Sequence, residues 1–336
     1  MSYKPCLMSM IYALLSCLLA GLLSGCDLNG PVPDYEPEEL PASEDFDAHT
    51  GTWNSNGSKI LFRHSDLSDP ENLRSKMLWV VEMDTGERYP VFGGPALNPD
   101  WCPDDEEILF HSNTAPSSIY KYNIPEDSLM RLTGNESPND PQKFRHTNIA
   151  RWSPNGEQVL FTSSSRQSEG HGLVIMNPDG TDAELIISIG VGGRWFPEGE
   201  RIVYVDWDDE QPGDRSRQLY TARADGSDQQ KITDLENSDL IAHPNVSPDG
   251  GTIAFTHRSG PANNDIFLLD LECGEKKQLT YTNHEIRRPV WHPDGDRILF
   301  SARKREHDPP SLPDVESRLY IVDVENGDIE PVFPEP

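Results

Sequence analysis

The feature that most constrains the fold of this chain is a motif that recurs six times. Each copy begins with a tryptophan, or once with a valine, continues through a short polar turn and ends in an apolar triplet. The copies span Trp53–Phe62, Trp101–Phe110, Trp152–Phe161, Trp195–Tyr204, Val246–Phe255 and Trp291–Phe300. Their first residues lie 48, 51, 43, 51 and 45 positions apart. A repeat of this length indicates one small structural unit per copy, each packed against its neighbours.

Each repeat contains four segments with the pattern of β-strands. The first segment ends at the aromatic residue, a turn of the Pro-Asp-Gly type reverses the chain, and the apolar triplet forms the second strand. We expect the third strands at Met77–Val81, Ile119–Tyr122, Leu173–Met176, Leu219–Ala222, Ile266–Leu269 and Leu319–Val322. We expect the fourth strands at Glu87–Phe92, Ser128–Thr133, Glu184–Ile187, Gln230–Thr233, Lys277–Thr280 and Ile329–Phe333. Because 29 prolines and 25 glycines also disfavour long helices, we predict an all-β fold, a six-bladed β-propeller of four-stranded antiparallel blades over residues 48–336.

The repeat resembles that of the TolB-like, WD-type propellers. Their consensus runs Pro-x-Trp-Ser-Pro-Asp-Gly and continues into an Ile-x-Phe strand, an Ile-Tyr strand and a Leu-Thr strand, as in Trp152–Phe161 here. The resemblance covers about 285 residues. The resemblance implies a function in the bacterial cell envelope that involves protein partners, because TolB-like proteins bind lipoproteins and components of the Tol system. The chain departs from TolB in its N-terminal segment, which leaves no room for the α/β domain of TolB, so an orthodox Tol role is doubtful.

The recurring aromatic residues do not indicate a catalytic role in this fold, because they are expected to pack between adjacent blades. Val246 fills less volume than tryptophan and marks a weaker seam. Cys102 and Cys273 fall in repeats on opposite sides of the ring, so we expect two unpaired thiols. Ring closure has two possible forms, packing between the first and last blades or an outer strand added by residues 43–48.

Residues 1–25 have the pattern of a secretory signal. An apolar run from Leu7 to Leu23 is followed by Ser24, Gly25 and Cys26, which resembles a bacterial lipobox. In that pattern the chain is cleaved before the cysteine, and Cys26 becomes the lipid attachment site. The alternative is an uncleaved membrane anchor. Residues 26–47 are acidic and proline-rich, without Lys or Arg, so we expect a disordered tether or, alternatively, a short interaction tail.

The repeat pattern also predicts two unequal faces of the ring. The short turns share one face, and the other, the long-loop face, carries the segments 63–76, 134–147, 206–217, 234–243 and 301–317. Binding sites concentrate on long loops held by a rigid scaffold. Nine of the ten histidines fall on this face, and several arginines accompany them. The candidate binding residues for a ligand or partner are His111, His146, His243, His257, His284, Arg287 and Arg288. The alternative is coincidence, since this face holds most of the loop residues.

Several classes of function are disfavoured. The net charge of −29 argues against nucleic-acid binding, which needs a basic surface. The chain has no Gly-x-Ser-x-Gly elbow, P-loop or dinucleotide-binding glycine motif. Only three residues follow position 333, so we expect no appended peptidase domain. The acidic loop Asp206–Glu210 lacks the spacing of an EF-hand and is interpreted as solvated. We predict no catalytic residue, no metal and no cofactor.

The favoured hypothesis is a monomeric, membrane-anchored lipoprotein that faces the periplasm or the cell surface. Its propeller binds an envelope protein or peptide through the long-loop face, without catalysis; the sequence does not decide between the inner and the outer membrane. The alternative is a metal-dependent polysaccharide lyase similar to oligogalacturonate lyase, with His111, His146, His243 and His284 as metal ligands and Arg287 or Arg288 on a substrate carboxylate. A third possibility is a structural or sensory lipoprotein without a small ligand.

Overall fold

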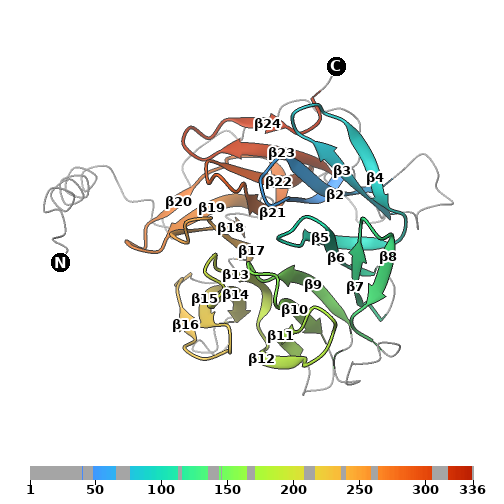
Figure 1. Ribbon diagram of the computed structural model, residues 1–336. Helices are drawn as coiled ribbons and strands as arrows, with labels where there is room; N and C mark the ends of the chain where they lie inside the picture. Colours follow the sequence, from blue (N-terminus) through green and yellow to red (C-terminus); the bar gives the residue numbers. More distant parts are fainter. Residues whose placement is uncertain are drawn as a thin grey trace, which may run out of the picture.

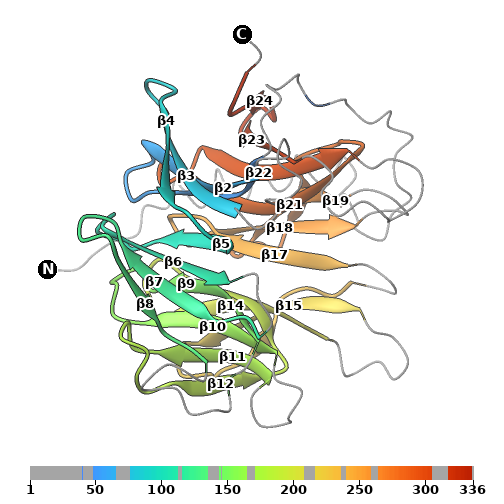
Figure 2. The ribbon, with the colours of Figure 1, turned by 90° about the vertical axis from the view of Figure 1, so that its right-hand side faces the viewer.

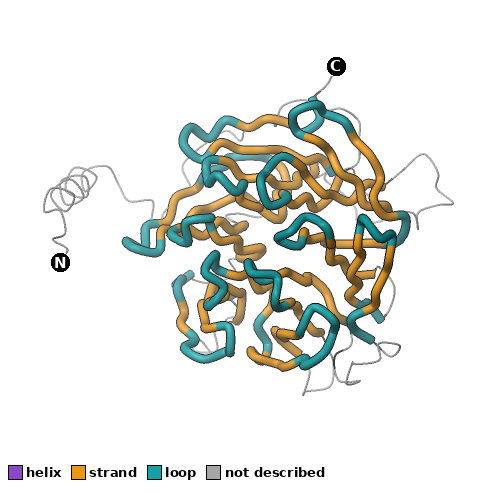
Figure 3. The backbone as a smooth tube through the Cα atoms, in the orientation of Figure 1, coloured by secondary structure: helices purple, strands orange, loops and turns teal. Residues whose placement is uncertain are grey.

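The computed structural model describes the repeat region of the chain. It covers residues 40, 48–65, 76–112, 116–134, 144, 146–164, 171–207, 216–235, 240–258, 264–304 and 317–334. The expected signal, the lipid attachment site Cys26, the tether apart from Leu40, and most of the long loops lie outside the described residues. Within the described part, strands are joined by turns and loops, and no helix long and apolar enough to cross a membrane is found (Figure 3).

The described residues form 24 strands, four in each repeat. The first strands are β1 (Ala48–Trp53), β5 (Ala96–Trp101), β9 (Thr147–Trp152), β13 (Val191–Trp195), β17 (Ile241–Val246) and β21 (His284–Trp291). The second strands are β2 (Lys59–Ser65), β6 (Glu107–Ser112), β10 (Val159–Ser164), β14 (Arg201–Trp207), β18 (Thr252–Arg258) and β22 (Arg297–Lys304). The third strands are β3 (Lys76–Glu82), β7 (Ile119–Asn123), β11 (His171–Met176), β15 (Arg217–Arg223), β19 (Asn264–Asp270) and β23 (Arg318–Asp323). The fourth strands are β4 (Arg88–Phe92), β8 (Ser128–Arg131), β12 (Glu184–Ser188), β16 (Gln230–Lys231), β20 (Lys276–Gln278) and β24 (Ile329–Pro331).

These strands form a β-propeller of four-stranded antiparallel blades. In each of the first four repeats, the strands pair in sequence order into a separate sheet. Figure 1 shows the repeats arranged as a ring, with the first strands β5, β9, β13, β17 and β21 nearest the centre. Figure 2 shows the ring after a quarter turn, with β21 above β17 and β5, and β9 below them. The six first strands, which we call the inner strands, therefore surround the axis of the ring.

The expectation of six separate sheets is wrong for the last two repeats. Their eight strands form one sheet, because β19 and β21 pair in parallel at Asn264 and Glu285. Both strands start at the long-loop face, so their first residues run side by side and the backbone bridges the seam. The four antiparallel strands expected in each of these repeats are present on either side of that bridge.

The aromatic residues pack between repeats, as the sequence predicts. Each lies in a buried cluster with side chains of the preceding repeat, as Trp101 does with Leu61 and Leu78. Val246 takes the same place against Phe196 in the seam before repeat five. Such tight packing of apolar side chains is the main favourable contribution to a folded repeat array.

Ring closure occurs by packing of the first repeat on the last. Trp53 lies in one buried cluster with Leu299 and Leu319 of repeat six. The rings of Phe62 and Phe333 are 5.4 Å apart. The inner strand β1 also begins with a hydrogen bond from the Ala48 N–H to the carbonyl of Ser317, at 2.9 Å. Ala48 thus belongs to an inner strand, and the other residues of the expected outer strand, 43–47, lie outside the described residues.

The Leu-Thr and Ile-Thr pairs that end three of the fourth segments have a structural role. The hydroxyl oxygens of Thr133, Thr233 and Thr280 accept hydrogen bonds, each 2.9 Å long, from backbone N–H groups at the start of the third strand. All three threonines are buried. A buried N–H without an acceptor is energetically costly. Each threonine hydroxyl therefore takes the place of the backbone carbonyl acceptor that the short fourth strand does not supply.

Candidate functional site

Every inner strand carries a β-bulge at the same place in the repeat. The residue three positions before the aromatic residue, or before Val246, has a left-handed backbone, with φ between 43° and 68°. These residues are Thr50, Asn98, Ile149, Gly192, His243 and Arg288. In each strand the register with the second strand shifts at this point. Bulges redirect side chains and recur near functional sites, and five of the six positions hold a residue other than glycine at an energetic cost.

Charged side chains precede the tryptophan in three consecutive inner strands. They are Asp100 in β5, Arg151 in β9 and Arg194 in β13. Nε of Arg151 lies 3.8 Å from Oδ1 of Asp100, and its Nη1 donates to the carbonyl of Ala150 at 2.7 Å. The other carboxylate oxygen of Asp100 accepts from the Trp152 N–H at 2.9 Å. Burial raises the pKa of Asp100, and the charges of Arg151 and Arg194 oppose that effect.

Arg194 and Arg288 have no such partner. Neither guanidinium makes a hydrogen bond or an ion pair with any residue that the structure describes. Burial lowers the pKa of Arg288 to about 9, and the neighbouring charge of Arg151 adds to the effect. The same causes, burial and then Arg151, lower the pKa of Arg194. The arginines of different repeats therefore repel one another inside the ring.

The charge of Arg288 contributes to the pKa shift of two of the predicted histidines. Burial lowers the pKa of His111 to about 3, and the charge of Arg288 is the next largest cause. Burial followed by Arg288 also lowers the pKa of His243, whose Nδ1 lies 3.1 Å from the hydroxyl of Thr256. Both imidazoles are consequently neutral at pH 7 and contribute hydrogen-bonding groups without adding charge. Of the candidate set, His111 and His243 are thus the residues on which the charge of Arg288 acts.

The remaining candidates lie elsewhere. His257 is enclosed in β18, where its ring meets Phe267 edge-on at 4.9 Å. His284, the first residue of β21, is buried. His146, the residue that precedes β9, is exposed. Arg287 is bound to Glu285, with Nη2 and Oε1 2.6 Å apart. The other oxygen of the same carboxylate, Oε2, lies 2.6 Å from Nη2 of Arg303. Arg287 is therefore already paired with an acidic side chain of the protein.

The geometry of this propeller agrees with what is known of related sequences. The family model described as the TolB beta propeller domain matches residues 141–330. This chain belongs to the TolB β-propeller family. Among curated proteins, the uncharacterized peptidase YuxL of Bacillus subtilis is 26% identical over 219 residues, or 64% of this chain. The match spans 31% of the length of YuxL, so the activity of that whole protein does not carry over.

Solved structures share the fold at low sequence identity. TolB of Acinetobacter baumannii superimposes with a TM-score of 0.64 at 19% identity, over 82% of this chain and 63% of that one. An oligogalacturonate lyase in complex with manganese superimposes with a TM-score of 0.55 at 12% identity, over 89% of this chain and 84% of that one. Identities this low establish a common architecture and leave the chemistry open.

A manganese site like that of a lyase does not fit this TolB-family propeller. His111, His146, His243 and His284 are all described, and they do not converge into a group that could hold an ion. Tetrahedral or octahedral coordination requires ligand atoms close to one another around one centre. The metal ligand set of the lyase alternative therefore has no counterpart in the geometry of these four side chains.

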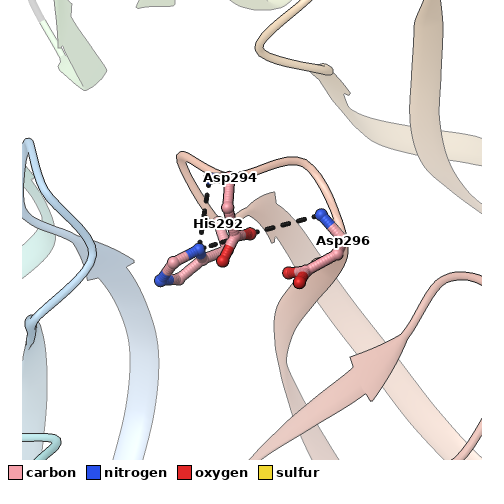
Figure 4. Close-up of side chains that lie close together, drawn as sticks. All are labelled: His292, Asp294 and Asp296. Atoms are coloured by element: carbon pink, nitrogen blue, oxygen red, sulfur yellow. Dashed lines mark hydrogen bonds and ion pairs between the residues drawn. The ribbon is translucent and has the colours of Figure 1, made fainter.

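One other group of potential ligands lies on the opposite, short-turn face. His292, Asp294 and Asp296 offer ligand atoms within 4.8 Å of one another in the turn after β21 (Figure 4). These three side chains already form hydrogen bonds and ion pairs with one another and with neighbouring residues. Nη2 of Arg297 lies 2.7 Å from Asp294, its Nε lies 3.1 Å from Asp296, and Nε2 of His292 lies 3.2 Å from the carbonyl of Gly57. The cluster is therefore best explained as part of the seam between repeats six and one.

The inner-strand residues Asp100, Arg151 and Arg194 are absent from the candidate set that the sequence predicts, because that set was drawn from the long-loop face. A signal was present in the repeat alignment. The position before the aromatic residue reads Thr52, Asp100, Arg151, Arg194, Asn245 and Val290, so that two consecutive repeats place an arginine at the same position of their inner strands. Aligned positions of adjacent repeats are neighbours in a ring, and a run of like charge at one aligned position therefore identifies a charged belt.

Proposed function

We propose that this TolB-family protein binds a protein or peptide of the cell envelope through its long-loop face, without catalysis. The observation that carries the proposal is Ile189, which is 47% exposed and has a left-handed φ of 76°. A β-branched residue rarely adopts this backbone, and exposed apolar side chains in strained positions are typical of binding surfaces. Leu240, which enters the next repeat at the same face, is 40% exposed.

Polar groups lie at the corresponding ends of other inner strands. Exposed His146 precedes β9, and the Glu285–Arg287 ion pair lies in β21. Exposed apolar side chains together with polar ones are the usual composition of a protein interface. For the arrangement of this face, we count the eight-stranded sheet as two blades, which gives six blades.

The test is capture of partners from native envelopes with the full-length chain. The informative variant is Ile189→Ser with Leu240→Ser, and the matched control is Leu129→Ser, which removes an equally exposed apolar residue from the outer strand β8. A partner that is retained by the wild type and the control and is lost in the double variant supports the proposal. A partner that is captured equally by all three chains contradicts the assignment to this face.

We also propose that the protein is a membrane-anchored lipoprotein, with residues 1–25 as the signal, Cys26 as the lipid attachment site and 26–47 as a tether. Support comes from the sequence pattern, since these residues lie outside the described part. Stable attachment requires more than one acyl chain, as a lipidated and acylated N-terminal cysteine provides. Cys26→Ala should move the protein from the membrane fraction to the soluble fraction. Retention of this variant in the membrane with an intact N-terminus would contradict the proposal.

A further inference from the structure

We propose that a pocket on the outer rim of the propeller, between the last strands of repeats one and two, binds a small organic ammonium ion at Asp127. The inference goes beyond the proposed function, because Ile189 follows β12 and Leu240 precedes β17, so neither belongs to these two repeats. It rests on the size of the pocket, on its aromatic wall and on a carboxylate without a basic partner.

The pocket lies between β4 of repeat one and the strands β7 and β8 of repeat two, on the outside of the ring (Figure 1). Its volume is about 430 Å³, which falls within the range of about 300–1,000 Å³ that is typical of small-molecule sites. Repeat one contributes Met77, Phe92 and Gly93 to its lining, and repeat two contributes Tyr122, Asp127 and Leu129. Leu129 is 51% exposed, so a ligand with an apolar body would remove apolar surface from water here.

Two aromatic rings form part of the pocket wall. The ring of Phe92 packs against that of Tyr122, with 5.2 Å between the centroids and an interplanar angle of 61°. Phe92 also packs against Phe110, at 4.6 Å, in the buried cluster between the two repeats. The faces of aromatic rings carry negative partial charge and attract a cation that lies above them. The wall therefore suits an apolar cation better than an anion.

Asp127 supplies the charge of this pocket, and no other described residue of the lining is charged. Its Oδ1 accepts a hydrogen bond from the Tyr122 hydroxyl at 2.7 Å, and its carboxylate forms no ion pair within the part of the chain that the structure describes. The basic side chains of β7 and β8 have other partners. Nζ of Lys121 lies 3.1 Å from Glu107, and Nε of Arg131 donates to a backbone carbonyl at 2.8 Å. A ligand ammonium can therefore pair with Asp127, and the net charge of −29 favours the approach of cations over anions.

The experiment is calorimetric titration of the purified full-length protein with three probes that share an apolar body: phenethylammonium, the neutral phenethyl alcohol and the anion hydrocinnamate. The first variant is Asp127→Asn, which removes the charge, keeps an acceptor oxygen for Tyr122 and tolerates the left-handed φ of 49°. The matched control is Asp182→Asn in the corresponding turn of repeat three. Asp182 is also left-handed, with φ of 52°, and accepts a hydrogen bond from Asn177 at 2.8 Å.

The second variant, Gly93→Leu, tests the place of binding without changing a charge. A Cβ at Gly93 would lie 3.9 Å from Cε of Met77 and would meet no other atom within 4 Å. The leucine side chain should therefore occupy the pocket beside Met77 and weaken the binding of phenethylammonium.

We expect the wild type and Asp182→Asn to bind phenethylammonium about fivefold more tightly than phenethyl alcohol, and hydrocinnamate least tightly. Asp127→Asn should lose this preference for the ammonium ion. Thermal unfolding without a probe should give the same melting temperature for Asp127→Asn and the wild type, because the bond to Tyr122 and the turn are kept.

The inference is overturned if phenethylammonium does not bind or binds no more tightly than the alcohol. It is also overturned if Asp127→Asn binds the ammonium ion as tightly as the wild type, or if Asp182→Asn weakens binding as much as Asp127→Asn does. None of these results depends on whether envelopes yield a protein partner, so failure here is distinguishable from failure of the proposed function.

Discussion

Nε2 of His292 lies 3.2 Å from the carbonyl oxygen of Gly57, across the seam where the first and last repeats meet. The His292 ring also packs edge-on against Trp53, with 4.6 Å between ring centroids. Gly57 has a left-handed φ of 74°, and a Cβ at this position would overlap the imidazole of His292. A histidine from repeat six therefore occupies the space that the absent side chain of a glycine in repeat one provides.

Gly57→Ala should destabilise the protein more than Gly86→Ala. Both glycines are left-handed, but a side chain at Gly86 would meet no atom within 4 Å. Gly86→Ala should lower the free energy of unfolding by about 1 kcal/mol for backbone strain alone. Gly57→Ala should lower it by about 2–3 kcal/mol, because the overlap with His292 adds to the strain. Urea unfolding measures both, and equal losses would show that His292 moves aside freely.

Asp265→Asn should stabilise the protein at pH 7 and remove part of its pH dependence. Burial raises the pKa of Asp265 to about 6, against opposing hydrogen bonds from Thr282 and Thr280. The folded state thus binds this proton more tightly than the unfolded state, so stability falls as the pH rises from about 4 to about 6. The gain at pH 7 should be on the order of 2 kcal/mol and should vanish near pH 4.

Asp270→Asn provides the control for this pH dependence. Backbone hydrogen bonds, the Cys273 N–H foremost, lower the pKa of Asp270, so its ionised form is the one that the fold favours. The stability that ionised Asp270 contributes is present above the pKa of this carboxyl in the unfolded state, and it is lost as the pH falls. Unfolding curves from pH 3.5 to 7.5 should therefore shift in opposite directions for the two variants at neutral pH, and the same direction for both would contradict the assignment.

Thr233→Val should cost about 1–3 kcal/mol of stability, because it leaves the buried N–H of Leu219 without its acceptor. The hydroxyl also donates to Oε1 of Gln218 at 2.7 Å, and valine removes that bond too. The matched control is Thr252→Val in β18, whose partly exposed hydroxyl makes no hydrogen bond with the described residues. That variant should lie within about 0.5 kcal/mol of the wild type. Similar losses for both would exclude a specific role for the hydroxyl.

In the folded protein, Cys273 should react with iodoacetamide at pH 8 while Cys102 does not. Both thiols are free, but Cys102 is buried and Cys273 is exposed. Burial raises the pKa of Cys102 to about 12, so almost no reactive thiolate is present. Peptide mapping by mass spectrometry after labelling in buffer and in urea measures each site. A peptide that links the two cysteines by a disulfide would contradict this expectation.

The sequence by itself determined the repeat, the strands and the turns of this protein. These features depend on contacts between residues close along the chain, such as the left-handed glycines of the turns and the apolar triplets that follow them. The place of Trp101 and Val246 between repeats could also be predicted, because every repeat must bury one face against its neighbour. The function of Thr133, Thr233 and Thr280 could not, since their backbone partners lie one strand away.

Only the tertiary structure decided which charged residues meet. Asp100 and Arg151 are far apart in the chain, and Nε of Arg151 comes within 3.8 Å of the Asp100 carboxylate only when the second and third repeats pack side by side. Ring closure decided that His292 contacts Gly57, and the packing of adjacent repeats decided that the last two share one sheet through Asn264 and Glu285. Electrostatic and packing interactions depend on distance in space, and a sequence pattern fixes that distance only within a repeat.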